Sequence, residues 1–256
     1  MTEMKKLFYN YIYFLYLPVV VLVTSVTTVF FGIVVIIIGF IPGLDKNNNF
    51  GYQIGKLWAW LNLKVTGTRL KVRGMDRIDR KRSYVVMSNH QSHFDVWAII
   101  SRLPLSLRWV MKIELRAIPV FGIGCEKLGQ IYVDRSNSEK ARESLEAAKT
   151  KIEAGASVVF FPEGTRSNDG RLLTFKKGGF HMALGTGTPI LPVTVNGGRF
   201  ALPKGLPFMM KPGKMEIIIH DPVEVEGLGF EDMDMLIKKV RGVIEGGLDL
   251  EYGRIF

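Results

Sequence analysis

The N-terminal part of the chain contains no charged residue between Leu7 and Leu44, and Val, Ile, Phe and Tyr dominate this stretch. About 20 apolar residues are enough for a helix to cross the roughly 30 Å hydrocarbon core of a bilayer. The stretch is much longer than the apolar region of about 7–15 residues in a signal peptide, and no small-residue cleavage pattern follows it. We therefore expect residues 1–66 to form an N-terminal anchor of hydrophobic membrane helices that stays attached.

Two arrangements of this anchor are consistent with the sequence. A single crossing of the bilayer is the simplest, but Lys residues lie on both flanks of the stretch, so the charge pattern does not fix an orientation. Residues 50–63 place Trp58 and Trp60 close to Lys56 and Lys64, a composition suited to the headgroup layer. The alternative is a long helix that folds back into a second, interfacial helix, with both immersed in one leaflet.

The charge balance of the chain favours anionic partners. It has 34 Lys and Arg against 24 Asp and Glu, a formal net charge of +10 and a pI near 9.6. Such an excess suits nucleic acid, anionic lipid or a phosphorylated substrate. A mean hydropathy of +0.16 and the uncharged N-terminal stretch favour lipid, because a protein that binds nucleic acid does not need a long apolar segment. We expect a phospholipid membrane as partner and no nucleic acid. Cys125 is the only cysteine in the sequence, which fits a reducing compartment.

After Gly67 the pattern changes to short apolar runs that alternate with amphipathic helical stretches, which is typical of an α/β domain. The predicted strands are residues 70–72, 84–88, 130–133, 157–161, 190–195 and 216–219. The predicted helices are residues 94–102, 138–153, 177–184 and 230–245, and residues 202–213 are predicted to form a loop. We expect residues 67–256 to form one domain with a mixed central sheet flanked by helices, in which Gly155 ends a helix in the left-handed conformation.

Polar residues cluster where the predicted strand 84–88 runs into a helix, in the sequence NHQSHFD from position 89 to 95. Such turns are where α/β folds place ligands. His90 is a candidate general base, and Asp95 could hold its ring by a hydrogen bond. Five residues correspond to about 140° on an ideal helix, so the two can meet only if His90 precedes the helix. The structural alternative is a helix cap formed by Ser92 with Asp95.

A metal site is an alternative interpretation of the same cluster. His90, His93 and Asp95 are potential ligands, and a catalytic zinc needs about three from the protein. The other histidines, His181 and His220, are not clustered, and the sequence has no Cys-x-x-Cys motif. A membrane-bound metallohydrolase is therefore kept as an alternative, while we expect no metal and no cofactor.

A second polar cluster follows the predicted strand 157–161, in the sequence PEGTRS from position 162 to 167. Arginine binds phosphate through paired hydrogen bonds, and backbone N–H groups of a glycine turn can add to such a site. The other basic residues that could assist are Lys112, Arg171, Lys176 and Lys177. These residues indicate an anion site, and the alternative is an ordinary polar surface turn.

Taken together, these segments resemble the glycerolipid acyltransferases, most closely the bacterial 1-acyl-sn-glycerol-3-phosphate acyltransferases. Four blocks occur in the expected order. NHQSHFD matches the His-x4-Asp block, and Lys112 with GQIYVDR, which ends at Arg135, is similar to the second region. FPEGTRS matches the third block and LPVTVNG the fourth, so the resemblance extends from about residue 72 to residue 225.

The resemblance implies transfer of an acyl chain to the sn-2 hydroxyl of 1-acyl-glycerol-3-phosphate (lysophosphatidic acid), with phosphatidic acid as the product for phospholipid biosynthesis. The acyl donor would be acyl-CoA or acyl-carrier protein. By position, the implied site residues are His90 as the base, Asp95 as its partner, Glu163, Gly164, Thr165 and Arg166 as the acceptor-binding loop, and Lys112 at the phosphate.

The resemblance also implies a place and a course for the reaction. Residues 67–256 would be the catalytic domain, held by the anchor at the cytoplasmic face of the cell (inner) membrane. Neither Ser92 nor Cys125 has a sequence setting typical of a nucleophile, so we expect direct transfer without a covalent acyl-enzyme. We expect the oxyanion to be met by backbone N–H groups near the start of the helix at 94–102. A noncatalytic protein that binds anionic lipid is the remaining alternative.

Overall fold

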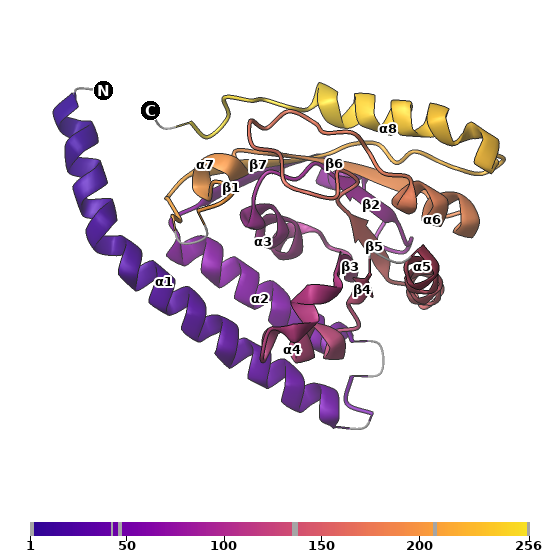
Figure 1. Ribbon diagram of the computed structural model, residues 1–256, viewed down its shortest axis with the longest axis horizontal. Coiled ribbons are helices and arrows are strands. Elements are labelled where there is room, and N and C mark those ends of the chain that lie inside the picture. The colour runs from indigo at the N-terminus through magenta and orange to yellow at the C-terminus, as the bar shows by residue number, and fades with distance from the viewer. Residues whose placement is uncertain (1–2, 42, 46–47, 135–137, 207–208, 255–256) are drawn as a thin grey trace.

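The computed structural model describes residues 3–41, 43–45, 48–134, 138–206 and 209–254, with side chains except those of 3–12 and 138–145. A central sheet separates two layers of helices (Figure 1). The strands are β1 (Arg69–Arg73), β2 (Val85–Ser88), β3 (Leu107–Lys112), β4 (Ile131–Val133), β5 (Ser157–Phe160), β6 (Ile190–Asn196) and β7 (Lys214–Ile219). The α-helices are α1 (Glu3–Phe40), α2 (Asn49–Val65), α3 (His93–Arg102), α4 (Phe121–Lys127), α5 (Ser138–Glu153), α6 (Gly178–Thr186), α7 (Gly198–Ala201) and α8 (Met233–Gly246). Short 3-10 helices are η1 (Met75–Arg77), η2 (Ile113–Ala117) and η3 (Phe230–Asp232).

The sheet has the order β1-β7-β6-β2-β5-β3-β4. Strands β2 to β6 run parallel to their neighbours in this group, whereas β7 is antiparallel to β6 and pairs in parallel with β1. The predicted mixed sheet flanked by helices is therefore confirmed. Because of these directions, the carboxyl ends of β2 to β6 and the amino ends of β1 and β7 lie at the same edge of the sheet, and this edge carries the polar motifs.

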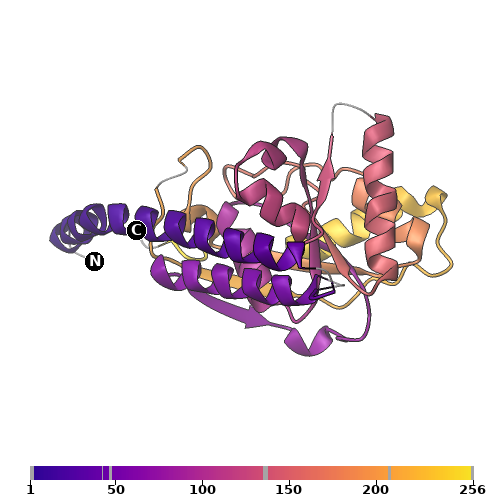
Figure 2. The same cartoon turned by 90° about the horizontal axis from the view of Figure 1, so that it is seen from below.

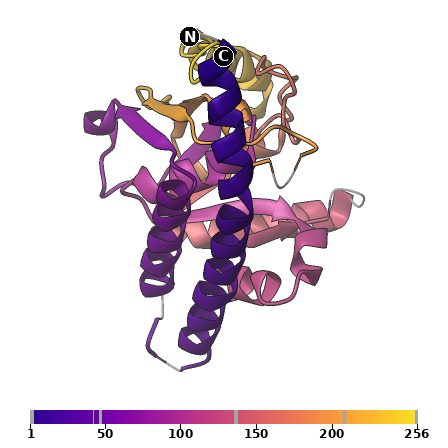
Figure 3. The same ribbon diagram turned by 90° about the vertical axis from the view of Figure 1, so that its left-hand side faces the viewer.

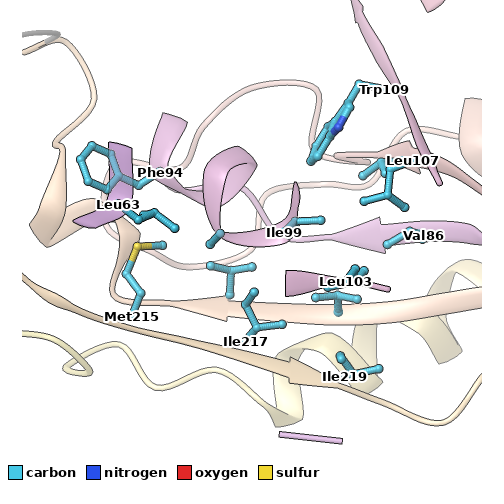
Figure 4. Close-up of a cluster of buried hydrophobic side chains, with 14 of the residues drawn as sticks. Leu63, Val86, Phe94, Ile99, Leu103, Leu107, Trp109, Met215, Ile217 and Ile219 are labelled. Atoms are coloured by element: carbon cyan, nitrogen blue, oxygen red, sulfur yellow. The ribbon is translucent and has the colours of Figure 1, made fainter. Parts of the chain in front are cut away.

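The central strand β2 shows how the sequence builds the two layers. Successive side chains of a strand point to opposite faces, and a strand covered on both faces is apolar throughout. Val86 joins the core shared with α2 and α3, together with Ile99 and Ile217 (Figure 4). Val85 and Met87 join the core on the other face, which is shared with α5, α6 and α8.

The six predicted strands and the four predicted helices are present, with small shifts at their ends, and Gly155 has the expected positive φ of 86°. The predicted loop 202–213 contains neither helix nor strand in its described residues, 202–206 and 209–213. Strand β3 and the short helices α4 and α7 were not predicted. The sequence of β3 contains Arg108, which would normally point to a surface position. In the fold, Arg108 is buried, with its guanidinium 5.9 Å from the ring of Tyr52.

The N-terminal helices pack against each other and against the α/β domain. Helix α1 lies beside α2, and its first turns extend past the rest of the molecule (Figures 2 and 3). Near one end of the contact, the hydroxyl of Tyr16 donates to the carbonyl of Val65 over 2.6 Å. Towards the other end, Gly32 lies against Val120 of the segment that leads into α4. Helix α2 in turn contributes Tyr52 to the domain core, so its packing is continuous with the domain. The division at residues 66 and 67 stays a prediction.

The side of α1 that faces away from the domain is apolar and exposed. In the described part of the chain, Tyr13–Phe40 is the one helical segment long and apolar enough to cross a membrane. Its exposed large apolar side chains include Leu15, Val19, Leu22, Val26, Val29, Ile33, Ile37 and Phe40. These positions recur every three or four residues, so they form one stripe along the helix. A large exposed apolar stripe is typical of a surface that contacts lipid or another protein.

Candidate active site

The site is built at the edge where the parallel strands end. Strand β2 leads into His90, the neighbouring β5 leads into the loop that contains Glu163, and β3 ends at Lys112. Open α/β sheets place ligands at this edge, outside the carboxyl ends of the strands. The fold thus brings together segments that lie far apart in the sequence.

His90 and Asp95 form the predicted pair. The distance from His90 Nδ1 to Asp95 Oδ2 is 3.0 Å. The pairing is possible because α3 begins at His93, so His90 lies before the helix. Asp95 is fully buried, whereas the side chain of His90 is 14% exposed. An ionised carboxylate can only accept hydrogen bonds, so this bond assigns the ring proton to Nδ1 and leaves Nε2 free to act as a base.

The helix-capping interpretation is also correct, because Asp95 both bonds the His90 ring and caps the start of α3. Its Oδ2 accepts hydrogen bonds from the backbone N–H groups of Gln91 over 2.6 Å and Ser92 over 2.7 Å. The Ser92 hydroxyl accepts from the N–H of Phe94 and donates to the carbonyl of Leu202. Helix capping therefore fixes the carboxylate that holds the His90 ring.

An aromatic side chain fixes the plane of the imidazole. The ring of Phe161, which directly follows β5, stacks on His90 with 3.8 Å between centroids and 7° between planes. Trp109 of β3 lies behind Phe161 at 5.4 Å. Phe161 was not predicted to be a site residue, since an aromatic residue at the end of an apolar strand looks like ordinary core.

Glu163 braces the backbone of His90. Its Oε1 accepts from the N–H of His90 over 2.7 Å, and its Oε2 accepts from the N–H of Leu173 over 2.8 Å. The N–H of Ser167 donates to the carbonyl of His90 over 2.8 Å. Burial raises the pKa of Glu163 to about 7, and its two backbone hydrogen bonds oppose this rise. The carboxylate is thus directed at the backbone of the His90 segment, while its predicted part in acceptor binding stays a prediction.

The other residues of the predicted acceptor loop lie beside this brace. Gly164 has a φ of +70°, and the side chain of Lys176 lies over it. Thr165 is exposed and Arg166 is partly buried. Partial desolvation and then the charge of Arg166 lower the pKa of His93 to about 4, which places this guanidinium near the start of α3. The loop therefore presents positive charge next to the His90 pair.

Lys112 lies at the same sheet edge, at the end of the strand that pairs with β5. It is the last residue of β3 and its side chain is exposed. Among the described residues, its ammonium group makes neither a hydrogen bond nor an ion pair, so it is available to an anion. Arg135, the end of the second sequence block, lies outside the described residues.

The fourth block, which ends in Asn196 and Gly197 and is followed by Gly198, packs against the segment that carries the pair. The side-chain amide of Asn89 donates to the carbonyl of Val195 over 2.8 Å and accepts from its N–H over 2.7 Å. A Cβ atom on Gly198 would overlap Asp95 Oδ1, an oxygen that is buried and has no hydrogen-bond partner among the described residues. The sequence signal for this contact is a pair of glycines directly after an apolar strand.

The candidate metal ligands do not form a ligand set. In the described portion of the chain, no three side chains from His, Cys, Asp and Glu converge in a way that could hold a metal ion. Asp95 Oδ2 already accepts from His90 and from two backbone N–H groups. The expectation that the protein uses no cofactor stays a prediction.

The fold and the site together define an α/β protein whose sheet edge carries a histidine–aspartate pair beside a cationic loop, which is a class of site suited to proton transfer next to an anionic ligand. The Acyltransferase family model matches residues 69–196, a range that includes both members of the pair and the loop. The chain therefore belongs to the acyltransferase family.

Individual relatives agree with this assignment. The chain is 32% identical to a chloroplastic 1-acyl-sn-glycerol-3-phosphate acyltransferase of Arabidopsis thaliana, over 86% of this chain and 61% of the relative. It is 30% identical to a 1-acyl-sn-glycerol-3-phosphate acyltransferase of Limnanthes douglasii, over 86% and 77% of the two chains. The crystal structure of the 1-acyl-sn-glycerophosphate (LPA) acyltransferase PlsC from Thermotoga maritima matches with a TM-score of 0.80 and 28% identity, over 93% of this chain and 95% of that one. The chain spans only 61% of the length of the chloroplastic relative from Arabidopsis thaliana and 50% of the length of the one from Brassica napus.

Proposed function

We propose that the protein transfers an acyl chain from acyl-CoA or acyl-carrier protein to the sn-2 hydroxyl of 1-acyl-glycerol-3-phosphate, and so forms phosphatidic acid for phospholipid biosynthesis. The observation that carries this proposal is the His90–Asp95 pair, held between a helix cap and the Glu163 brace beside a cationic loop. Relatives with this activity by name, and the family membership of the chain, support the choice of substrates.

The pair can perform the proton transfer that the reaction needs. Nε2 of His90 takes the proton of the acceptor hydroxyl as the oxygen attacks the thioester carbonyl. Asp95 stabilises the resulting imidazolium. When the tetrahedral intermediate collapses, the carbon–sulfur bond breaks and the imidazolium returns the proton to the thiolate. The products are the new ester and a free thiol.

Two candidate nucleophiles are poorly suited to a covalent route. Burial raises the pKa of the Cys125 thiol to about 12, so it stays protonated at neutral pH. The hydroxyl of Ser92 donates to the Leu202 carbonyl and is buried in the helix cap. Direct transfer between the two bound substrates is therefore the proposed course.

Three of the backbone donors near the start of α3 are already engaged. At the start of α3, the N–H groups of Gln91 and Ser92 donate to Asp95, and that of Phe94 donates to Ser92. Among the described residues the N–H of His93 has no such acceptor, so this group and others around Nε2 of His90 are left to stabilise the oxyanion.

The acceptor phosphate is assigned to the loop beside the pair. Arg166 offers a guanidinium, and Gly164 and Thr165 offer a turn with little side-chain bulk and an exposed hydroxyl. Lys112 adds an exposed ammonium from the neighbouring strand. Holding the phosphate here would place the hydroxyl of the same glycerol near His90, which converts the encounter into a reaction within one complex.

The anchor is proposed to lie in one leaflet on the cytoplasmic side of the cell membrane. Helix α1 contacts the rest of the protein from Tyr16, bonded to Val65, to Gly39, packed on Lys127. Because the domain lies alongside nearly all of the apolar segment, a crossing helix would pull the domain into the bilayer. The apolar stripe on the outer side of α1 can enter one leaflet without this cost.

The function is tested by thiol release from acyl-CoA in the presence of lysophosphatidic acid, with the full-length chain in detergent. We expect His90→Ala to lower kcat by a factor of about 100 or more, the scale for loss of a general base. The matched control is His181→Ala, which changes an exposed histidine on α6. A wild-type protein that releases no thiol, or an equal loss in both variants, would contradict the proposal.

The membrane arrangement is tested in a Cys125→Ser background that carries Glu3→Cys. A membrane-impermeant thiol reagent should label the new cysteine from the side on which the catalytic domain lies. Labelling from the opposite side alone would show that α1 crosses the bilayer.

A further inference from the structure

A hollow of about 230 Å³ lies where α2 ends, β1 begins and α3 ends. We call it the α2–β1 hollow, and it is lined by Trp60, Leu63, Lys64, Thr68, Arg69, Leu70 and Arg102. Its three cations come from three different elements, and all three side chains are exposed. The other lining residues are Trp60, Leu63, Leu70 and Thr68, so the hollow combines three cations with apolar side chains and one hydroxyl.

Within the described residues, none of these three cations forms an ion pair with a carboxylate. On β1, the neighbouring Lys71 and Arg73 pair with the buried Glu216 at 3.8 and 2.7 Å. Arg69 has no such carboxylate within the described residues, and its register partner on β7 is Lys214, another cation. Like charges on directly opposed strand positions repel each other. Lys214 lies outside the hollow, and it offers Arg69 no compensating charge.

The hollow borders the apolar anchor. Trp60 is 41% exposed, and the ammonium of Lys64 lies 5.9 Å from the centre of its ring. Leu57, one turn earlier on α2, is also exposed, and α1 is attached at this point by the bond from Tyr16 to Val65. Exposed tryptophan and lysine beside an apolar surface are typical of the headgroup level of a membrane.

The hollow is near the reaction site but distinct from it. Strand β1 is three strand spacings from β2, which is about 14 Å at roughly 4.8 Å per spacing. The amino end of β1, where Arg69 lies, is at the same sheet edge as His90. None of the residues of the hollow belongs to the His90 pair or to the loop at 163–166.

We propose that the α2–β1 hollow binds the headgroup of an anionic membrane phospholipid, with its phosphate between Arg69, Arg102 and Lys64. The chain position of the hollow, next to the anchor, favours a lipid headgroup over a soluble anion. Such a lipid would hold the active-site edge close to the surface from which the acceptor lipid arrives. The inference rests on the proposed membrane association and does not require the proposed acyl transfer.

The test measures which lipids stay bound to the full-length chain. The protein is equilibrated in mixed micelles with phosphatidylcholine in large excess over phosphatidylglycerol, and the co-purified lipids are quantified by mass spectrometry. We expect the wild type to be enriched in phosphatidylglycerol. Each cation near an anionic headgroup contributes about a fivefold preference, so Arg69→Gln with Arg102→Gln should lower the enrichment by about 25-fold.

Three comparisons make the result specific. Lys238→Gln with Lys239→Gln removes the same charge from the exposed face of α8 and should leave the enrichment unchanged. Arg69→Lys, which keeps the charge, should retain most of it. The single variant Arg69→Gln serves if the double variant does not fold, as judged by its thermal melting.

Two outcomes overturn the proposal. An equal loss in the α8 variant would show an effect of net charge alone, and displacement of phosphatidylglycerol by millimolar inorganic phosphate would show a site for the free anion. Absence of acyl transfer in the wild type would refute the proposed function but would leave the lipid enrichment unaffected, so the two failures are distinguishable.

Discussion

Glu163→Gln should change how stability depends on pH, because the pKa of this buried carboxyl is raised from its usual 4.5 to about 7. The folded protein keeps a proton that the unfolded chain releases above pH 4.5. The free energy of unfolding therefore falls as the pH rises from about 4.5 to about 7. A rise of this size corresponds to about 3 kcal/mol at pH values above 7, at about 1.4 kcal/mol per unit.

Glutamine does not titrate, so this contribution disappears in the variant. We expect the stability of Glu163→Gln relative to wild type to increase by about 3 kcal/mol between pH 4.5 and pH 8. The same substitution should lower kcat, although it raises the relative stability at high pH. The amide has one accepting oxygen, so the N–H of either His90 or Leu173 loses its acceptor, at a cost of about 1–3 kcal/mol. A displaced His90 should lower kcat about tenfold or more.

The assay is guanidinium unfolding in detergent at several pH values, combined with thiol release at pH 8. The control is Glu153→Gln, which changes an exposed carboxyl at the end of α5. If the stability difference between wild type and Glu163→Gln is the same at all pH values, the carboxyl is not desolvated in the folded protein and the reasoning is wrong.

Four further substitutions test other parts of the structure. Asp95→Asn should lower kcat by a factor of about 100 or more in the thiol-release assay, because an amide favours the wrong tautomer of the base. Gly198→Ala should displace Asp95 and lower kcat about tenfold or more in the same assay, whereas Gly242→Ala, where the added methyl meets open space, should leave kcat unchanged. Arg166→Lys should raise KM for lysophosphatidic acid more than it lowers kcat, since paired hydrogen bonds to phosphate are lost. Ile99→Ala should lower the free energy of unfolding by about 2–5 kcal/mol in guanidinium titrations, because Ile99 is fully buried in the core.

The apolar pattern of the chain was sufficient to locate most elements of the fold. Strands such as β2 and β6 are buried along their whole length and are therefore largely apolar, which a sequence shows directly. Strand β3 could not be located in this way, because Arg108 interrupts its apolar pattern. The burial of Arg108 depends on Tyr52 of α2, a residue far away in the sequence, and such a partner is visible only after folding.

The part of the candidate site that lies within a few residues along the chain was also predictable from the sequence. His90 and Asp95 lie within five residues, and the start of a helix between them can be anticipated from Ser92. The brace by Glu163 was not predictable, because it joins backbone and side chain across 73 positions. The sequence motif placed Glu163 in the acceptor loop, while the fold directs both of its oxygens to backbone N–H groups.

The sequence by itself therefore determined the long apolar N-terminal helix, the alternation of strands and helices, and the residue types able to move a proton and bind a phosphate. These properties depend on local composition and on periodicity along the chain. Only the tertiary structure decided that Phe161 stacks on the imidazole, that Gly198 leaves room for the Asp95 carboxylate, and that α1 packs along the domain. Contacts of this kind depend on the order and direction of strands in the sheet, which bring distant segments to one edge.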